Sequence, residues 1–123
     1  MRLHVIAIGA AAWASTASAM PVSVFVAKAD ALKAKGPFAL FSGDLKLLTN
    51  QVKADFKQIL TEHAAAKKAN RPTAFCPPQG SSIKLTDKDI MGAMQAVPPP
   101  QRARTDSKDA LRGLLVRRFP CAT

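Results

Sequence analysis

Proline and glycine residues divide this chain into four segments, and each segment has apolar residues at the spacing of an α-helix. The breaks are Gly36-Pro37, Asn70-Arg71-Pro72, Pro98-Pro99-Pro100 and Pro120. Proline lacks a backbone N–H and cannot continue a helix interior, so these positions predict helix ends. No stretch of convincing length alternates between apolar and polar residues as a half-buried strand would. The pattern predicts an all-α fold, a compact bundle of four main helices with short helical or turn connectors.

The first predicted helix covers residues 23–35. Apolar residues recur along it at intervals of four and three and define a narrow buried stripe: Phe25, Ala29 and Leu32. Three further apolar residues follow the Gly36-Pro37 break and are called the 38–41 cluster: Phe38, Leu40 and Phe41. We expect the 38–41 cluster to plug the core between the helices.

The longest helix is predicted over residues 43–69, with Ser42 as its N-cap. Its apolar residues have near-heptad spacing and predict one buried face: Leu45, Leu48, Val52, Phe56, Ile59 and Leu60. The charged residues are assigned to the other faces: Lys46, Lys53, Asp55, Lys57 and Glu62. Residues 70–85 follow it, and their Pro, Gly and Ser content favours an ordered loop.

Two shorter helices complete the predicted bundle. Thr86 and Asp89 have the spacing of a capping box, and Leu85 can pack on Ile90 as a hydrophobic staple. The apolar stripe of this third helix is Ile90, Met94 and Val97. The last helix is capped by Thr105 or Asp106 and ends before Pro120. Its apolar stripe is Leu111, Leu114, Leu115 and Phe119.

The first nineteen residues have the pattern of an export signal. A positive start, an apolar run and the small-residue cleavage site Ala17-Ser18-Ala19 follow one another. A transmembrane helix is the rival interpretation, but about 20 apolar residues are needed to cross a bilayer and this run is shorter. We therefore expect a cleaved signal peptide at residues 1–19 and a periplasmic chain, residues 20–123, that forms one helical domain without a membrane span.

The chain is strongly basic. Its formal net charge is +10 at pH 7, and removal of the predicted signal with its one Arg leaves +9. Such a charge favours anionic partners, although the basic residues are mixed with acidic ones as on a solvated helical surface. They are densest near the C-terminus: Arg102, Arg104, Lys108, Arg112, Arg117 and Arg118. Nucleic acid is disfavoured, because residues 20–123 have neither Tyr nor Trp to stack on bases and no recognised binding motif.

Both cysteines lie in the part of the chain that is predicted to be exported. An oxidising compartment lets two thiols persist as a disulfide, so we expect one structural bridge between Cys76 and Cys121. This bridge would tie the loop after the long helix to the end of the chain. A reactive thiol pair would more often have a close spacing such as Cys-x-x-Cys, which is absent from the sequence.

The sequence gives little support for catalysis. His63 is the only histidine after the predicted signal, and we expect it to be a solvated surface residue. Two carboxylate pairs, Asp87 with Asp89 and Asp106 with Asp109, lie at predicted helix starts, where capping explains them. Neither a nucleophile motif, a zinc-ligand spacing nor a Gly-rich phosphate loop is present. We expect the chain to have no catalytic activity and to bind neither a metal nor a cofactor.

Two segments of the second half are similar to a known pattern. Phe75-Cys76-Pro77-Pro78-Gln79-Gly80 forms a turn in mid-chain, and Arg118-Phe119-Pro120-Cys121 ends the last helix. Together with the export signal, they resemble the Rap/Tai group of small exported helical proteins, whose founding members are immunity proteins against type VI secretion amidase effectors. The resemblance covers residues 75–121, and the N-terminal half matches nothing in the pattern.

The resemblance implies an all-helical periplasmic protein, often a homodimer, that blocks the substrate groove of a secreted peptidoglycan amidase and catalyses nothing itself. Cys76 and Cys121 match the disulfide positions of the family, and Phe119 and Pro120 match the pair that ends its last helix. The inhibitory contacts do not carry over, because they lie on variable surfaces in that family. Composition and expected exposure point to these partner-binding residues: Pro78, Gln79, Gly80, Ser81, Ser82, Arg102 and Arg104.

A second hypothesis remains open. The +9 charge could serve a small envelope protein that binds an anionic cell-wall polymer, a lipid or an acidic protein without inhibiting anything. Salt separates the two hypotheses, because binding to a polyanion weakens steeply as salt rises, whereas an inhibitor with a packed contact keeps most of its affinity.

Overall fold

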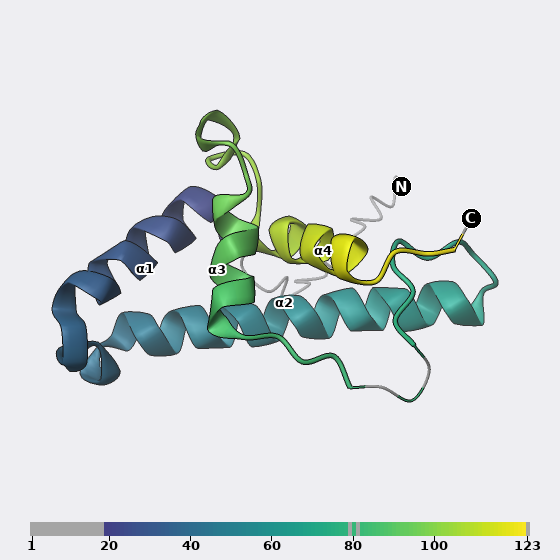
Figure 1. The fold of residues 1–123 in the computed structure, drawn as a ribbon, viewed down its shortest axis with the longest axis horizontal. Coiled ribbons are helices and arrows are strands. Elements are labelled where there is room, and N and C mark those ends of the chain that lie inside the picture. Colours follow the sequence, from purple (N-terminus) through teal and green to yellow (C-terminus); the bar gives the residue numbers. More distant parts are fainter. Residues whose placement is uncertain (1–18, 79, 81, 123) are drawn as a thin grey trace, which may run out of the picture.

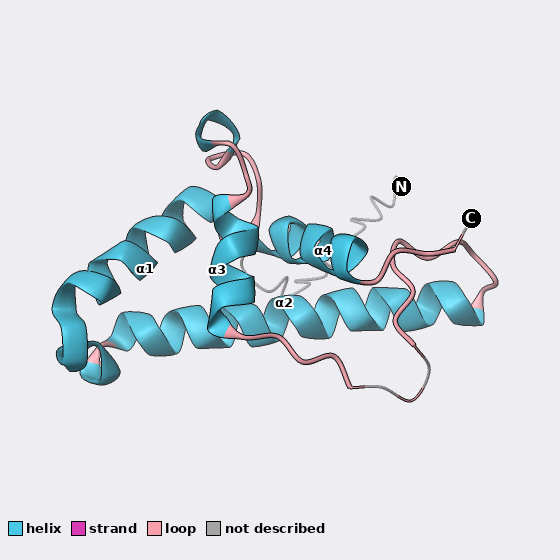
Figure 2. Cartoon of the chain, in the orientation of Figure 1, coloured by secondary structure: helices cyan, strands magenta, loops and turns pink. Residues whose placement is uncertain are grey.

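The computed structural model describes residues 19–78, 80 and 82–122. Within these ranges the chain forms four α-helices, two 3-10 helices and no strand (Figure 2). The elements are α1 (Val22–Lys35), η1 (Gly36–Phe41), α2 (Gly43–Lys68), α3 (Asp87–Gln95), η2 (Pro99–Gln101) and α4 (Ser107–Arg118). The predicted all-α bundle is confirmed. Residues 1–18 of the predicted signal peptide lie outside the described residues.

The long helix α2 runs along one side of the molecule, and α1 and α4 pack against it (Figure 1). α1 joins the start of α2 through η1, α3 packs against α4 and α1, and α4 lies along the second half of α2. The loop after α2 returns along the end of this helix and meets the C-terminal segment. The C-terminal end of the chain therefore lies beside the second half of α2, far from η1.

The core is formed by one stripe from each helix. Its fully buried side chains come mainly from α1, α3 and α4, with Ile59 from α2. The clustered residues are Met20, Val22, Phe25, Ala29, Leu32, Leu48, Ile59, Phe75, Met94, Ala110, Leu111 and Leu115. The predicted stripes of α1 and α4 thus contribute as expected, and Val97 and Phe119 pack at the edge of the core.

The buried face of α2 is more open than the sequence predicts. Leu48 and Ile59 are buried, whereas Leu45, Val52 and Phe56 are only partly covered and Leu60 is 41% exposed. For Leu45 and Val52 the reason is that α1 and α2 diverge, leaving an apolar groove of about 510 Å³ that α3 closes on one side. Leu45 and Val52 line this groove from α2, opposite Phe25 and Leu32 of α1.

The prediction that the 38–41 cluster fills the core is wrong. Phe38 is 74% exposed, Leu40 76% and Phe41 88%, and only Ala39 of this turn packs against the core. Gly36 takes a positive φ of 55° and Pro37 opens the 3-10 turn, which reverses the chain between α1 and α2. Side chains three residues apart lie on the same side of a 3-10 turn, so Phe38 and Phe41 both point away from the helices.

Asp55, which the sequence predicts on a face of α2 other than the apolar one, is nevertheless buried. Its side chain is 4% exposed, because α4 packs on a second face of α2. The fully buried hydroxyl of Ser107 donates to Oδ2 of Asp55 at 2.5 Å, and Nε2 of Gln51 donates to its Oδ1 at 2.9 Å. A buried carboxylate is thus satisfied by side chains of two helices, as buried polar groups require.

The helix starts agree closely with local sequence rules. Ser42 accepts from the backbone N–H of Asp44 at 3.3 Å. Thr86 and Asp89 form the predicted capping box, which holds the pKa of Asp89 below its ordinary value through the bond from the Thr86 backbone N–H. Asp106 is the N-cap residue of α4 but makes no side-chain capping bond.

Candidate protein-binding site at the disulfide

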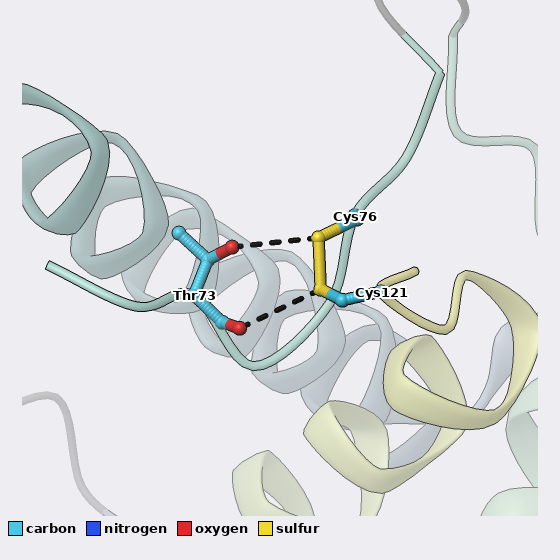
Figure 3. The surroundings of a disulfide bond; sticks show 3 residues. All are labelled: Thr73, Cys76 and Cys121. Carbon is cyan, nitrogen blue, oxygen red and sulfur yellow. Dashed lines mark hydrogen bonds between the residues drawn. A yellow bond between two sulfur atoms is a disulfide. The ribbon is translucent and has the colours of Figure 1, made fainter. Parts of the chain in front are cut away.

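Cys76 and Cys121 form the expected disulfide, with their Cα atoms 4.8 Å apart (Figure 3). The bridge joins the loop after α2 to the segment after α4. A backbone hydrogen bond reinforces it, because the N–H of Cys76 donates to the carbonyl oxygen of Phe119 at 2.8 Å. Two independent links therefore hold the loop at Cys76, two residues before the exposed Pro78.

Thr73 lies directly against the two sulfur atoms (Figure 3). Its Oγ1 is 3.6 Å from the Sγ of Cys76, and its carbonyl oxygen is 3.6 Å from the Sγ of Cys121. A disulfide sulfur carries no hydrogen, so the Thr73 hydroxyl is the donor in the first contact and the second is a close sulfur–oxygen contact. Thr73 thus fixes the loop on the other side of the bridge.

Phe75 and His63 connect this loop to α2. Phe75 is 2% exposed, and its ring stacks on the ring of His63 with the centroids 4.4 Å apart and the planes 17° from parallel. The expectation of a solvated His63 is therefore wrong: the loop folds back over the histidine, and its Nδ1 is buried without a hydrogen-bond partner among the described residues. Burial holds the pKa of His63 below its ordinary value, and the positive charge of Lys67 adds to this effect.

The lowered pKa of His63 predicts a loss of stability in mildly acidic solution. In the unfolded chain His63 titrates at its ordinary pKa, so the unfolded state binds more protons than the folded state as the pH falls below about 6.5. The free energy of unfolding should therefore decrease as the pH falls from 6.5 toward the lower pKa of the folded state. Urea unfolding at a series of pH values checks this prediction. In His63→Gln, the part of the decrease that arises from protonation of His63 should be absent.

Direct titration provides the control for this prediction. NMR of the His63 ring in the chain that begins at Met20 should give a pKa below the ordinary value, and Lys67→Gln should raise it. A pKa at or above the ordinary value in the folded protein would contradict the stacked, desolvated histidine.

Charged residues bridge α2 and α4 next to the histidine. Glu62 accepts from Arg112 at 2.6 Å and from Lys108 at 3.3 Å, and Arg112 also contacts Asp109 at 2.7 Å. Arg112 holds the pKa of Glu62 below its ordinary value, and Lys108 contributes in the same direction. Much of the basic charge near the C-terminus is thus paired, because Arg118 also contacts Asp89 at 2.8 Å.

A shallow hollow of about 140 Å³ lies beside the disulfide. It is lined by residues of α2, of the loop and of α4: Ile59, Glu62, His63, Ala66, Pro72, Thr73, Ala74, Phe75 and Arg112. The hollow combines an aromatic wall, a carboxylate and a guanidinium. This is a surface that can receive a polar side chain of a partner protein.

The predicted contact residues fall into two separate groups. Pro78, Gly80 and Ser82 are exposed in the loop that precedes α3, and Gln79 and Ser81 lie outside the described residues. Arg102 and Arg104 follow the opposite end of α3, whose 9 residues span about 14 Å (Figure 1). The two groups do not form one continuous contact surface.

Arg102 has a structural role that the sequence analysis missed. Its Nε donates to the carbonyl oxygen of Val97 at 2.8 Å, and one guanidinium nitrogen donates to the carbonyl oxygen of Gln95 at 3.0 Å. These carbonyls belong to the end of α3, where unpaired carbonyl groups carry partial negative charge. Arg104, in contrast, is exposed. The Pro98–Arg104 loop is therefore anchored by Arg102 and exposes Arg104.

Two further observations concern the described part of the chain. No group of three or more His, Cys, Asp or Glu side chains there is placed to hold a metal ion. Among the described helices, none combines the length and the apolar character needed to cross a bilayer.

The fold and the site together define a small helical protein with one disulfide between a mid-chain loop and the C-terminal segment. No protein-family model matches the chain, and the searches of curated proteins and of solved structures gave no match either.

Proposed function

We propose that this chain is a periplasmic immunity-type protein that binds and inhibits a peptidoglycan amidase effector. The observation that carries the proposal is the Cys76–Cys121 disulfide in an all-helical domain, at the positions where the chain resembles the Rap/Tai group. The loop that starts at Cys76, in which Pro78, Gly80 and Ser82 are exposed, is the inhibitory element. It enters the substrate groove of the amidase and excludes the peptidoglycan stem peptide.

The anchoring of this loop favours tight binding. At its start the disulfide, the backbone bond from Cys76 to Phe119 and the buried ring of Phe75 hold the chain in place. A segment that is ordered before it meets its partner loses less conformational entropy on binding. The loop therefore needs fewer favourable contacts to reach the affinity of an inhibitor.

The positive charge of the chain restricts the proteins that it can bind. The chain is strongly basic, so the face of the amidase around its groove must be neutral or acidic. At the binding end, Glu62 pairs with Lys108 and Arg112, and Arg112 also pairs with Asp109, so the charges of these four residues balance. Shape and packing then determine the affinity, and the overall charge accelerates association.

An inhibition assay tests the proposal. The exported chain, from Met20 onward, is mixed with each type VI amidase effector of the producing strain, and digestion of peptidoglycan sacculi is measured. We expect one amidase to be inhibited at a one-to-one ratio. Ser82→Trp, in the exposed loop after Cys76, should weaken this inhibition at least tenfold, because the larger side chain obstructs the groove.

Arg104→Trp is the matched control, because it introduces the same side chain at an exposed position beyond the opposite end of α3. It should change inhibition less than twofold, and both variants should keep the thermal melting temperature of the parent chain. Activity of every amidase at excess of the chain would overturn the proposal. Loss of inhibition in Arg104→Trp alone would move the inhibitory element to the Pro98–Arg104 loop.

A further inference from the structure

The 38–41 cluster is the most exposed group of large apolar side chains in the described residues. Elsewhere the exposed large apolar residues are Val24, Leu47, Leu60 and Val116, with exposures from 38% to 44%. The three side chains of the cluster have 74% to 88% of their surface in contact with solvent. They occupy the turn at which α1 and α2 meet, at the extreme end of the molecule (Figure 1). Such a concentration of apolar surface marks an interaction site.

Basic residues flank the turn on both sides. Lys33 and Lys35 lie in the last turn of α1, and Lys46 lies in the first turns of α2. The one acidic residue between positions 33 and 46 is Asp44, and Lys28 neutralises it at 3.3 Å. This end of the molecule thus combines the exposed apolar side chains of the 38–41 cluster with an excess of positive charge.

We propose that the turn Gly36–Phe41 is a membrane anchor that inserts the 38–41 cluster into the surface of a bilayer with anionic phospholipids. The apolar side chains enter the boundary between head groups and acyl chains, and Lys33, Lys35 and Lys46 bind the phosphate groups. The 3-10 turn between the two helices presents the three side chains together.

The shape of the cluster favours a bilayer over a protein partner. The three side chains project from a narrow turn, and each exposes about three quarters of its surface or more. A folded partner would need a deep socket that encloses all of them, because protein contacts require complementary shapes. A bilayer surface has no fixed shape, so it can accommodate the projecting side chains of the 38–41 cluster without a complementary pocket.

This anchor goes beyond the proposed inhibitory function and is spatially separate from it. The turn precedes α2, and the disulfide lies beside the far end of this helix (Figure 1). The 26 residues of α2 extend about 39 Å. A chain anchored at the turn would therefore hold its disulfide end away from the bilayer, where cell-wall enzymes act.

Tryptophan fluorescence tests the insertion directly. The chain that begins at Met20 contains no Trp, so Phe41→Trp in this chain places a single reporter in the turn. With vesicles of phosphatidylethanolamine and phosphatidylglycerol, we expect a blue shift and a rise in intensity. Phosphatidylcholine vesicles or 0.5 M salt should reduce the effect at least threefold. Val116→Trp, placed in α4, is the control and should show no shift.

Sedimentation with vesicles gives the second measurement. The exported chain with Phe38→Ser, Leu40→Ser and Phe41→Ser should bind anionic vesicles at least tenfold more weakly than the parent chain. The matched variant Val24→Ser, Leu60→Ser and Val116→Ser removes three exposed apolar side chains elsewhere and should bind within twofold of the parent.

Two results would overturn the anchor. One is equal vesicle binding by the parent chain and the 38–41 variant. The other is a blue shift of Phe41→Trp that grows with protein concentration in the absence of lipid, because a second copy of the chain would then cover the turn. Neither result bears on amidase inhibition, which is measured in solution without lipid.

Discussion

Replacement of both Cys76 and Cys121 by serine is expected to lower the free energy of unfolding by about 4 kcal/mol. The bridge joins residues 45 positions apart and restricts the unfolded chain far more than the folded one. In the folded state the backbone bond from Cys76 to Phe119 and the buried Phe75 remain to hold the loop. For a domain of this size, the loss corresponds to a fall of about 15 to 20 °C in the melting temperature.

Thermal unfolding followed by circular dichroism measures this effect. Addition of a thiol reductant to the parent chain should reproduce the fall, and the same reductant should leave the double serine variant unchanged. A difference in melting temperature below about 5 °C would show that the bridge restricts an unfolded chain that is already compact in this region.

Ser107→Ala is expected to lower the free energy of unfolding by about 2 to 3 kcal/mol. The Ser107 side chain is fully buried and donates the 2.5 Å bond to the carboxylate of Asp55. Without this hydroxyl, the 4% exposed carboxylate keeps only the bond from Gln51. A buried acceptor left without its partner costs the full desolvation of that group.

A double-mutant cycle separates this bond from the packing around it. Urea unfolding of Ser107→Ala, Asp55→Ala and the combined variant should give a coupling energy above about 1 kcal/mol. Thr61→Ala serves as the control, because its exposed hydroxyl donates to the Lys57 carbonyl at 2.7 Å and its loss should cost less than about 0.5 kcal/mol. Additive effects in the cycle would contradict a direct bond between Asp55 and Ser107.

The features that follow from short-range rules could be predicted from the sequence. The capping box at Thr86 and Asp89 needs only residues three positions apart, and proline needs only its own ring to end a helix. The apolar stripe of α1 could also be predicted, because Phe25, Ala29 and Leu32 are all buried on one face of this helix. The four helices and their order were predictable for this reason.

The features that depend on packing between distant segments could not be predicted. Asp55 is buried by Ser107, which lies 52 positions further along the chain, and His63 is covered by a loop that folds back onto α2. Apolar periodicity assigns one buried face to a helix, but α2 packs against partners on two faces. The exposure of the 38–41 cluster follows from the direction in which a turn projects, and composition carries no information about that direction.

The candidate site was predicted in part. The two cysteines and the loop that follows the first of them could be recognised from sequence, since two thiols in a chain that is predicted to be exported favour a disulfide. The hollow beside the bridge could not, because Glu62, Phe75 and Arg112 come from three separate elements. The anchoring role of Arg102 could not be predicted either, because the carbonyl groups that it binds become accessible only where α3 ends.

The sulfur–sulfur bond also turns the second half of the chain into a covalent ring. Residues 76–121 contain α3 and α4, whereas α1 and α2 precede the ring. A protease that cuts one peptide bond between these cysteines opens the ring without releasing a fragment, and the helices on either side of the cut stay joined. A cut before Cys76 separates two pieces that no covalent bond connects. The chain is therefore far more tolerant of nicking in its C-terminal half than in the hairpin formed by its first two helices.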